Sequence, residues 1–315
     1  MKKIALPLLT LILILVFSFS AAASTVSVAT ELANVRSHYT KKTELTLFEE
    51  TLALASMGML TGRTAYVPPE ATDAEGLAKR ILALAAQGTE APKEEEIQAL
   101  TKLQNEEGAF GPVEIHCTAM LALSSQKAIY NSAKAYEWLI AQQGNNGCFD
   151  GSIRATALAV AAFSLSENSE EALASAKAVK YLSDAEASDA TELAWQIIGI
   201  TDGGVDANTA GDRNLLENLL SYQNTSDHSF YRSKNDTESD PLSTAMAVAA
   251  LDAINEDSSL FQRLAKEGKL TFYDPEDLRP LLIFAGVALA LSVAFWIYVF
   301  LHKKSTRTLE ETKTY

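Results

Sequence analysis

The feature that most constrains this chain is a short phrase that returns at a fixed spacing. Residues 104–110 and 143–149 both follow the pattern Q-x-x-x-G-x-F, and the two copies begin 39 residues apart. A looser third copy, 223–230, contains one extra residue and lies about two periods after the second. A repeat of this length is typical of stacked supersecondary units, because one unit cannot bury its apolar face alone. We expect the glycine of each phrase to supply a positive φ in a tight turn.

Each copy leads into a segment made largely of small apolar residues, namely 118–122, 156–162 and 244–253. A degenerate unit without the glycine lies before the third copy and contains a similar segment, 191–200. Helices that are apolar almost all round are buried on several sides. The helices between them carry charges on one face and are expected outside, for example 133–142 and 171–181. The alternation predicts an all-α fold of two concentric layers.

The buried class numbers about six along the chain, near 45–60, 74–87, 115–126, 153–165, 188–200 and 242–254. Six helical hairpins arranged head to tail can close a ring, which removes the exposed apolar ends of a solenoid. The sequence therefore predicts an α/α toroid with inner and outer helix rings. An open helical-repeat solenoid is the structural alternative.

Local signals place some helix ends. Thr72 and Glu75 have the spacing of a capping box that opens a helix over 74–87, and Gly88 fits as its stop. Asp212 and Asp240 are expected to be N-caps of later helices.

The charge balance narrows the classes of partner. The chain has 315 residues, 48% of them hydrophobic, and a formal net charge of −14, while the segment between its basic ends carries −18. Such a domain repels nucleic acid and anionic lipid headgroups, although an acidic surface more often serves solubility. The two cysteines, Cys117 and Cys148, lie about one repeat apart. A single disulfide and two free thiols both fit this spacing.

The first 23 residues have the three parts of a secretory signal peptide. Two lysines precede an apolar run, and an alanine cluster places the cleavage site between Ala23 and Ser24. An uncleaved N-terminal anchor is the alternative reading.

A second apolar run, 281–301, contains no charge and is long enough to span a membrane as a helix. Lys303 and Lys304 follow it, so the positive-inside rule predicts a cytoplasmic tail, 302–315, and a domain outside the cell membrane. This single-pass organisation gives an N-terminal segment, 24–42, and a juxtamembrane connector, 256–280, around the repeat domain.

The Q-x-x-x-G-x-F turn followed by an alanine-rich T-A-x-A-x-x-A-L helix resembles the repeat of the prenyltransferase and squalene-cyclase superfamily. The resemblance covers roughly residues 43–255. The chain is also similar to bacterial exported, membrane-anchored repeat proteins and, more distantly, to the helical domain of cobalamin carriers. The resemblance implies an α/α toroid around a central cavity, and it specifies no activity.

The catalytic signatures of that superfamily are missing from the sequence. No D-x-D-D motif, which clusters carboxyls to make a strong acid, occurs. The zinc-binding D-x-C pattern has only a reversed counterpart, 148–150, and the four histidines have no ligand spacing. We therefore expect no catalytic residue, no metal site and no cofactor.

The candidate ligand contacts are aromatic and basic residues of the turns and the buried helices: Phe110, His116, Phe149, Arg154, Trp195 and Phe230. Core packing is the favoured role of each aromatic residue, and pairing with a neighbouring carboxylate is the favoured role of Arg154.

These observations favour a membrane-anchored, extracytoplasmic and non-catalytic repeat protein. Its cavity or rim would bind a small hydrophobic or corrinoid-like ligand, or an envelope protein. The alternatives are an enzyme acting on an isoprenoid or a glycan at the membrane surface, and a purely structural envelope ectodomain.

Overall fold

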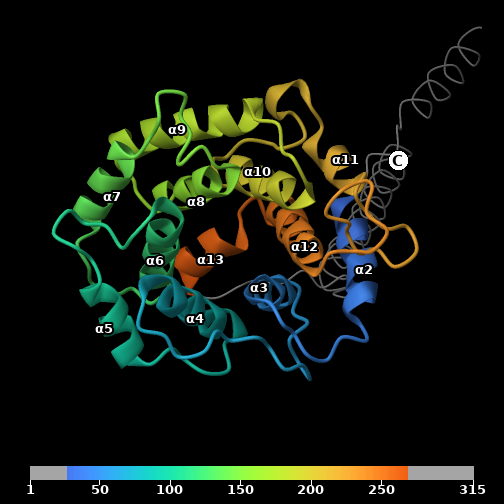
Figure 1. Ribbon diagram of the computed structural model, residues 1–315, viewed down its shortest axis with the longest axis horizontal. Helices are drawn as coiled ribbons and strands as arrows, with labels where there is room; N and C mark the ends of the chain where they lie inside the picture. Colours follow the sequence, from blue (N-terminus) through green and yellow to red (C-terminus); the bar gives the residue numbers. More distant parts are fainter. Residues whose placement is uncertain (1–26, 269–315) are drawn as a thin grey trace, which may run out of the picture. The chain divides into compact units, whose positions relative to one another are not determined.

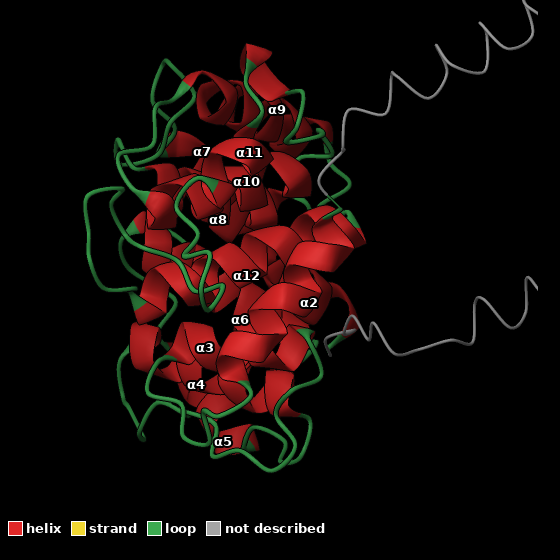
Figure 2. Cartoon of the chain, turned by 90° about the vertical axis from the view of Figure 1, so that its right-hand side faces the viewer, coloured by secondary structure: helices red, strands yellow, loops and turns green. Residues whose placement is uncertain are grey.

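The computed structural model describes residues 27–268, and within that range every regular element is helical (Figures 1 and 2). The prediction of an all-α protein is thus confirmed. The expected signal peptide, membrane segment and cytoplasmic tail all lie outside the described residues. Among the helices of residues 27–268, none combines the length and apolar character that a membrane crossing requires.

The described helices follow one another along the chain with short connections. Their bounds are α2 Val28–Tyr39, α3 Phe48–Ser56, α4 Ala74–Gln87, α5 Glu94–Lys102, α6 Val113–Ser125, α7 Ser132–Ala141, α8 Ile153–Phe163, α9 Ser169–Asp184, α10 Ala190–Asp202, η1 Ala210–Asp212, α11 Leu215–Leu220, α12 Pro241–Glu256 and α13 Leu260–Glu267.

Apart from α13, six helices bury most of their residues, and we call these six the inner helices: α3, α4, α6, α8, α10 and α12. They match the six buried segments expected from the sequence. Each inner helix packs against the next one in this order, and α12 also packs against α3. Figure 1 shows α13 within this circuit of contacts. The alanines and other small residues of these helices let neighbouring backbones approach closely on several sides.

Helices α5, α7, α9 and α11 lie outside the inner helices in Figure 1 and alternate with them along the chain. Their solvent faces carry the charged residues, and α5 buries only Leu100. The expectation of six complete hairpins fails between α3 and α4, where the chain forms a loop over 57–73. Gly58, Gly62 and the Pro68-Pro69 pair explain this, because glycine and proline disfavour a helix interior.

Two of the expected helix caps need correction. The N-cap of α4 is Asp73 rather than Thr72, and its carboxylate accepts a hydrogen bond from the Gly76 amide at 2.9 Å. The N-cap of α11 is Asn214 rather than Asp212, which ends a short 3-10 turn instead. The left-handed stop of α4 at Gly88 is confirmed.

The turn glycines are required for two reasons. Gly108 and Gly147 both have a positive φ, 99° and 91°. A Cβ on Gly108 would also lie 2.5 Å from the carbonyl group of Lys134 in α7, and one on Gly147 would come closer still to the carbonyl oxygen of Lys177 in α9. Each turn therefore presses against the outer helix of the following unit, with no room for a side chain.

Helix α13 falls in the segment 256–280 that we assigned to a juxtamembrane connector. Its residues 260–265 are buried, and it packs mainly against α6, with further contacts to α3, α4, α8 and α12. The repeat pattern ends before α13, but the packed core does not. A short helix with one arginine in its middle gives no buried-helix signal in the sequence, because the partner of this charge, Asp252, lies in the preceding helix.

Polar contacts hold α13 at its start and in its middle. The Asp202 carboxylate, at the end of α10, accepts hydrogen bonds from the amide and hydroxyl of Ser259 at 2.7 and 2.6 Å. The Asp252 carboxylate of α12 pairs with Arg263 of α13, and both side chains are buried. Burial raises the pKa of Asp202 and of Asp252 to about 6, since removal from water disfavours the charged carboxylate.

Gly147→Ala tests the close approach of the turn. We expect it to lower the free energy of unfolding by about 1 kcal/mol for the positive φ and by a further 1–3 kcal/mol, roughly, for the overlap with Lys177. Gly151→Ala is the matched control, because this glycine has φ 63° and open space around its Cβ position. Urea denaturation of both variants measures the difference. Equal losses would refute the packing role.

Asp202→Asn tests the buried carboxylate. A folded-state pKa of about 6, above the ordinary value of 3.8, means that the folded protein binds the proton more tightly than the unfolded chain. Asp202 therefore adds stability below about pH 4, and this stability is lost as the pH rises through 6. In urea denaturation, we expect the wild type to gain stability relative to Asp202→Asn between pH 7 and pH 4. A pH-independent difference would show that Asp202 stays ionised throughout.

Candidate functional site

The repeated turns join one unit to the next through a glutamine amide. The Nε2 group of Gln104 donates hydrogen bonds to the carbonyl oxygens of Gly108 and Asn131, both at 2.9 Å. Gln143 makes the equivalent bonds, to Gly147 at 3.1 Å and to Ala174 at 2.8 Å. Asn131 caps α7, and Ala174 lies in α9. Each glutamine thus ties its own turn to the following outer helix.

The three turn phenylalanines pack in the core rather than at a surface. The side chains of Phe110, Phe149 and Phe230 are at most 5% exposed. The amide of Phe149 donates to the Thr156 hydroxyl at 3.0 Å, and the amide of Phe230 donates to Thr244 at 2.9 Å. A hydroxyl near the start of the next inner helix therefore satisfies each of these buried amides. The phenylalanines thus connect each turn to the core and have a structural role.

His116 takes the place of the threonine in the first turn. Its Nδ1 atom accepts a hydrogen bond from the Phe110 amide at 3.3 Å, and its Nε2 atom lies 3.1 Å from the carbonyl oxygen of Ala135. A ring that accepts at Nδ1 carries its proton on Nε2, which then donates to Ala135. Burial lowers the pKa of His116 to about 4, against a smaller opposing effect of the bond to Ala135. His116 is a neutral, structural histidine at pH 7.

Arg154 and Trp195 are the two candidate residues that the structure brings together. The guanidinium carbon of Arg154 lies 5.5 Å from the centre of the Trp195 ring, within the range of a cation–π contact. The Trp195 ring also stacks on the ring of Phe261 in α13, with centroids 5.4 Å apart. Trp195 is only 4% exposed, so it links the surface residue Arg154 to the central helix.

Arg154 borders a pocket of about 270 Å³, which we call the Arg154 pocket. It lies between the first turns of three inner helices and is lined by Glu75, Lys79, Pro112, Glu114, Ile115, Thr118, Asp150 and Arg154. Charged groups of both signs therefore surround a small apolar floor. The Lys79 ammonium lies 2.6 Å from Glu75, and the Arg154 Nε atom lies 3.3 Å from a Glu114 oxygen.

The pairing of Arg154 with Glu114 is loose. Both side chains are more than one-third exposed, and the Arg154 Nε atom forms no hydrogen bond within the described residues. Exposed ion pairs of this kind contribute about 0–1 kcal/mol, so an incoming group can replace either partner at little cost. The expectation that a carboxylate neutralises Arg154 is confirmed, and the pair lies at the surface.

Sequence reasoning missed Glu114, although a signal for it exists. Glu114 and Arg154 are 40 residues apart, close to the repeat period of 39, and each lies near the start of an inner helix. Residues one period apart occupy equivalent places on neighbouring units, so charges of opposite sign at this spacing are expected to meet.

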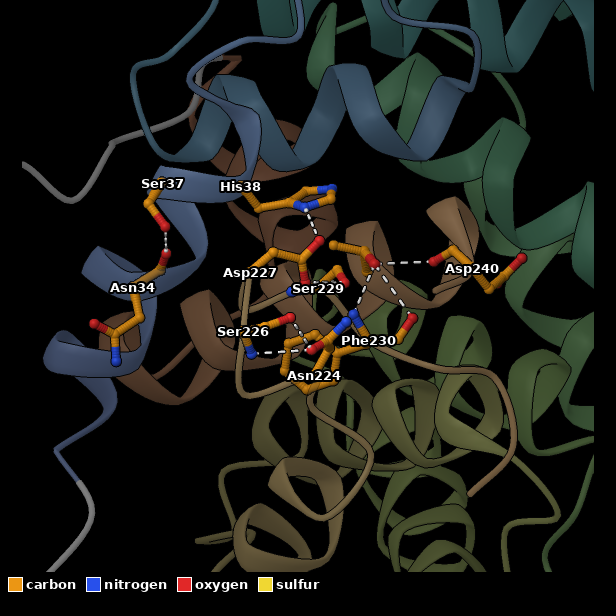
Figure 3. A network of polar contacts seen from close by, with 10 residues as sticks. Asn34, Ser37, His38, Asn224, Ser226, Asp227, Ser229, Phe230 and Asp240 are labelled. Atoms are coloured by element: carbon orange, nitrogen blue, oxygen red, sulfur yellow. Dashed lines mark hydrogen bonds and ion pairs between the residues drawn. The ribbon is translucent and has the colours of Figure 1, made fainter. Parts of the chain in front are cut away.

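The third turn differs because its neighbour is the N-terminal helix α2 (Figure 3). His38 of α2 pairs with Asp227 of the turn at 3.4 Å, and Asp240 caps α12 as the sequence predicted. The Nε2 group of Gln223, which corresponds to Gln104 and Gln143, is buried and has no partner within residues 27–268. Helix α2 covers this turn without reproducing the glutamine joint.

Other chemistry is limited in the described part of the chain. No group of three or more His, Cys, Asp or Glu side chains in residues 27–268 could hold a metal ion. Cys117 is buried and Cys148 half-buried, and both are free thiols. Burial raises the pKa of the Cys117 thiol far above its ordinary value, so it is a poor nucleophile. No protein-family model matches the chain, and no curated protein shows a significant match to it.

His116→Gln tests the buried neutral histidine. A folded-state pKa of about 4, below the ordinary 6.5, means that the unfolded chain binds the proton more tightly. His116 therefore loses its stabilising effect as the pH falls from about 6.5 to 4. We expect the advantage of the wild type over His116→Gln in urea denaturation to shrink across this range, by roughly 1–3 kcal/mol. Lower pH is thus expected to reduce the advantage of the wild type over His116→Gln and to increase its advantage over Asp202→Asn. If lower pH changed both differences in the same direction, the neutral state of His116 would be contradicted.

Proposed function

We propose that residues 43–255 form an α/α toroid of the prenyltransferase and squalene-cyclase type. The order of contacts among the inner helices supports this, since the last of them, α12, packs against the first, α3. The alternation of buried and charged helices supports it further. The repeated glutamine and glycine joints would set the same angle between successive units, as a ring requires.

We propose that this domain is a non-catalytic binding module, held outside the cell membrane by the apolar segment 281–301. The observation that carries the proposal is the Arg154 pocket, where charges of both signs converge around Pro112 and Ile115. A volume of about 270 Å³ lies below the usual range of 300–1,000 Å³ for small-molecule sites. It suits one or two side chains of a protein partner better than a corrinoid or another large apolar ligand.

The chemistry of the pocket favours a partner that carries both an acid and a base. A carboxylate from the partner can replace Glu114 at the Arg154 guanidinium, where planar, bidentate pairing is available. An ammonium or guanidinium group from the partner can then pair with the released Glu114 or with Asp150. Exchange of one ion pair for two, partly shielded from water by the partner, gives specificity through complementary charge.

Site-specific photo-crosslinking in the native host tests this proposal. A photoreactive residue at Ile115, in the full-length chain, should give a discrete adduct with an envelope protein. The same residue at Leu173, which is 60% exposed on the outer helix α9, is the matched control and should not. Arg154→Ala should reduce the Ile115 adduct at least fivefold, and Arg232→Ala, which removes an ion pair with Asp189 outside the pocket lining, should leave it unchanged. An Ile115 adduct that survives Arg154→Ala, or equal adducts at both positions, would refute the proposed site.

A further inference from the structure

Helix α13 is surrounded by the inner helices of the domain. Its backbone packs against five of the six inner helices, its Phe261 ring stacks on Trp195 of the sixth, α10, and residues 260–265 are buried. Figure 1 shows α13 inside the inner helices. No other described helix lies inside the inner ones. The chain reaches it through a link of three residues, 257–259, and leaves it at Gly268 beside the end of α6, where a Cβ would lie 3.0 Å from the carbonyl oxygen of Ser125.

The contacts of α13 are specific in the way that a bound peptide's contacts are. Phe261 stacks on Trp195, which supplies an aromatic anchor. Arg263 pairs with Asp252 inside the core, which supplies a charge anchor. Asp202 accepts both hydrogen bonds from Ser259, the N-cap of α13. An apolar face with one basic group at its centre therefore meets an apolar site that holds two carboxylates.

The buried charges that hold α13 contribute little to the stability of the domain. A buried ion pair gains little over apolar residues of similar size, because both charges lose their hydration. The Nε group of Arg263 is buried and finds no hydrogen-bond partner in the described structure. The raised pKa values of both aspartates express the same desolvation cost. Eight residues are also too few to keep a helix formed without its site.

The link before α13 is suited to act as a hinge. Asp257, which is exposed, ends α12 in the left-handed conformation with φ 53°, so the chain changes direction there. Movement of α13 away from its site would rehydrate the two carboxylates and Arg263. The inner helices would keep their contacts with one another, since these do not pass through α13.

We propose that α13 is a releasable plug, and that the site it fills is a second binding site that accepts a cationic amphipathic helix of a protein partner in place of α13. This site is distinct from the Arg154 pocket and its existence does not depend on the function proposed there. The incoming helix would place an aromatic side chain on Trp195 and a basic side chain on Asp252, as α13 does.

Hydrogen exchange of the full-length wild-type protein in detergent tests whether α13 opens by itself. We expect the amides of 263–265 to exchange at least tenfold faster than those of 245–253 in α12, although the residues of both segments are buried. Equal protection of the two segments would show that α13 leaves only when the whole domain unfolds, and it would overturn the proposal.

A labelled peptide with the sequence of residues 257–268 tests the vacated site. Full-length protein with Phe261→Ala, which loses the stack on Trp195, should bind this peptide at least tenfold more tightly than the wild type, whose own α13 competes. A peptide with the Arg263→Glu change should lose at least tenfold in affinity for the Phe261→Ala protein. The Lys266→Glu peptide is the matched control, because Lys266 is exposed in α13, and it should bind within about twofold.

Two results would overturn the proposal. One is equal peptide affinity for the wild type and the Phe261→Ala protein, measured after circular dichroism has shown that the variant is folded. The other is an equal effect of the two charge reversals, which would indicate attraction to the acidic surface instead of entry into the site. If the variant does not fold, the hydrogen-exchange comparison in the wild type still decides whether α13 is releasable.

Discussion

The close approach of each turn to the next outer helix is the contact on which the arrangement of units depends. A glycine without a Cβ lies against a helix carbonyl, and a glutamine amide beside it bonds to both segments. These two requirements act together, because the amide can reach the second carbonyl only when the backbones nearly touch. The inner helices then take their positions from the turns, and their small side chains allow the resulting short distances.

The places where this joint is missing show what replaces it. In the degenerate unit, which has no glycine turn, Gln196 of the inner helix α10 donates to the carbonyl of Ala185 at 2.9 Å and so ties the end of α9. At the third turn, the Gln223 amide has no partner within residues 27–268, and an ion pair between His38 and Asp227 joins α2 to the turn instead. Neighbouring units therefore need a polar contact to hold them together, and different side chains can supply it.

Much of the fold was predictable because it is local. Periodic apolar residues identified the six inner helices, and Gly88 marked a helix end by its own conformation. Helix α13 was not predictable, because its burial depends on Asp202 and Asp252, which lie outside its own segment. For the same reason the turn phenylalanines were ambiguous, since only tertiary structure decides whether an aromatic ring faces a cavity or a core. Arg154 was identified, but its partner Glu114 required the repeat period to be applied to charges as well as to apolar residues.

Trp195 is the residue at which the two proposed sites meet. Its ring contacts Arg154 on the side of the pocket and Phe261 on the side of α13, so the pocket and the plug share one buried side chain. When a partner binds Arg154 and draws it away from Trp195, the cation–π contact is lost. When α13 leaves its site, the stack of Phe261 on Trp195 is lost. Each event changes the surroundings of the same indole, and this gives the two sites a contiguous physical connection. Coupling of this kind requires an element with two discrete positions. The proposed plug α13 supplies such an element, since one aromatic stack, one buried ion pair and the hydrogen bonds of Ser259 hold it near its start and its middle.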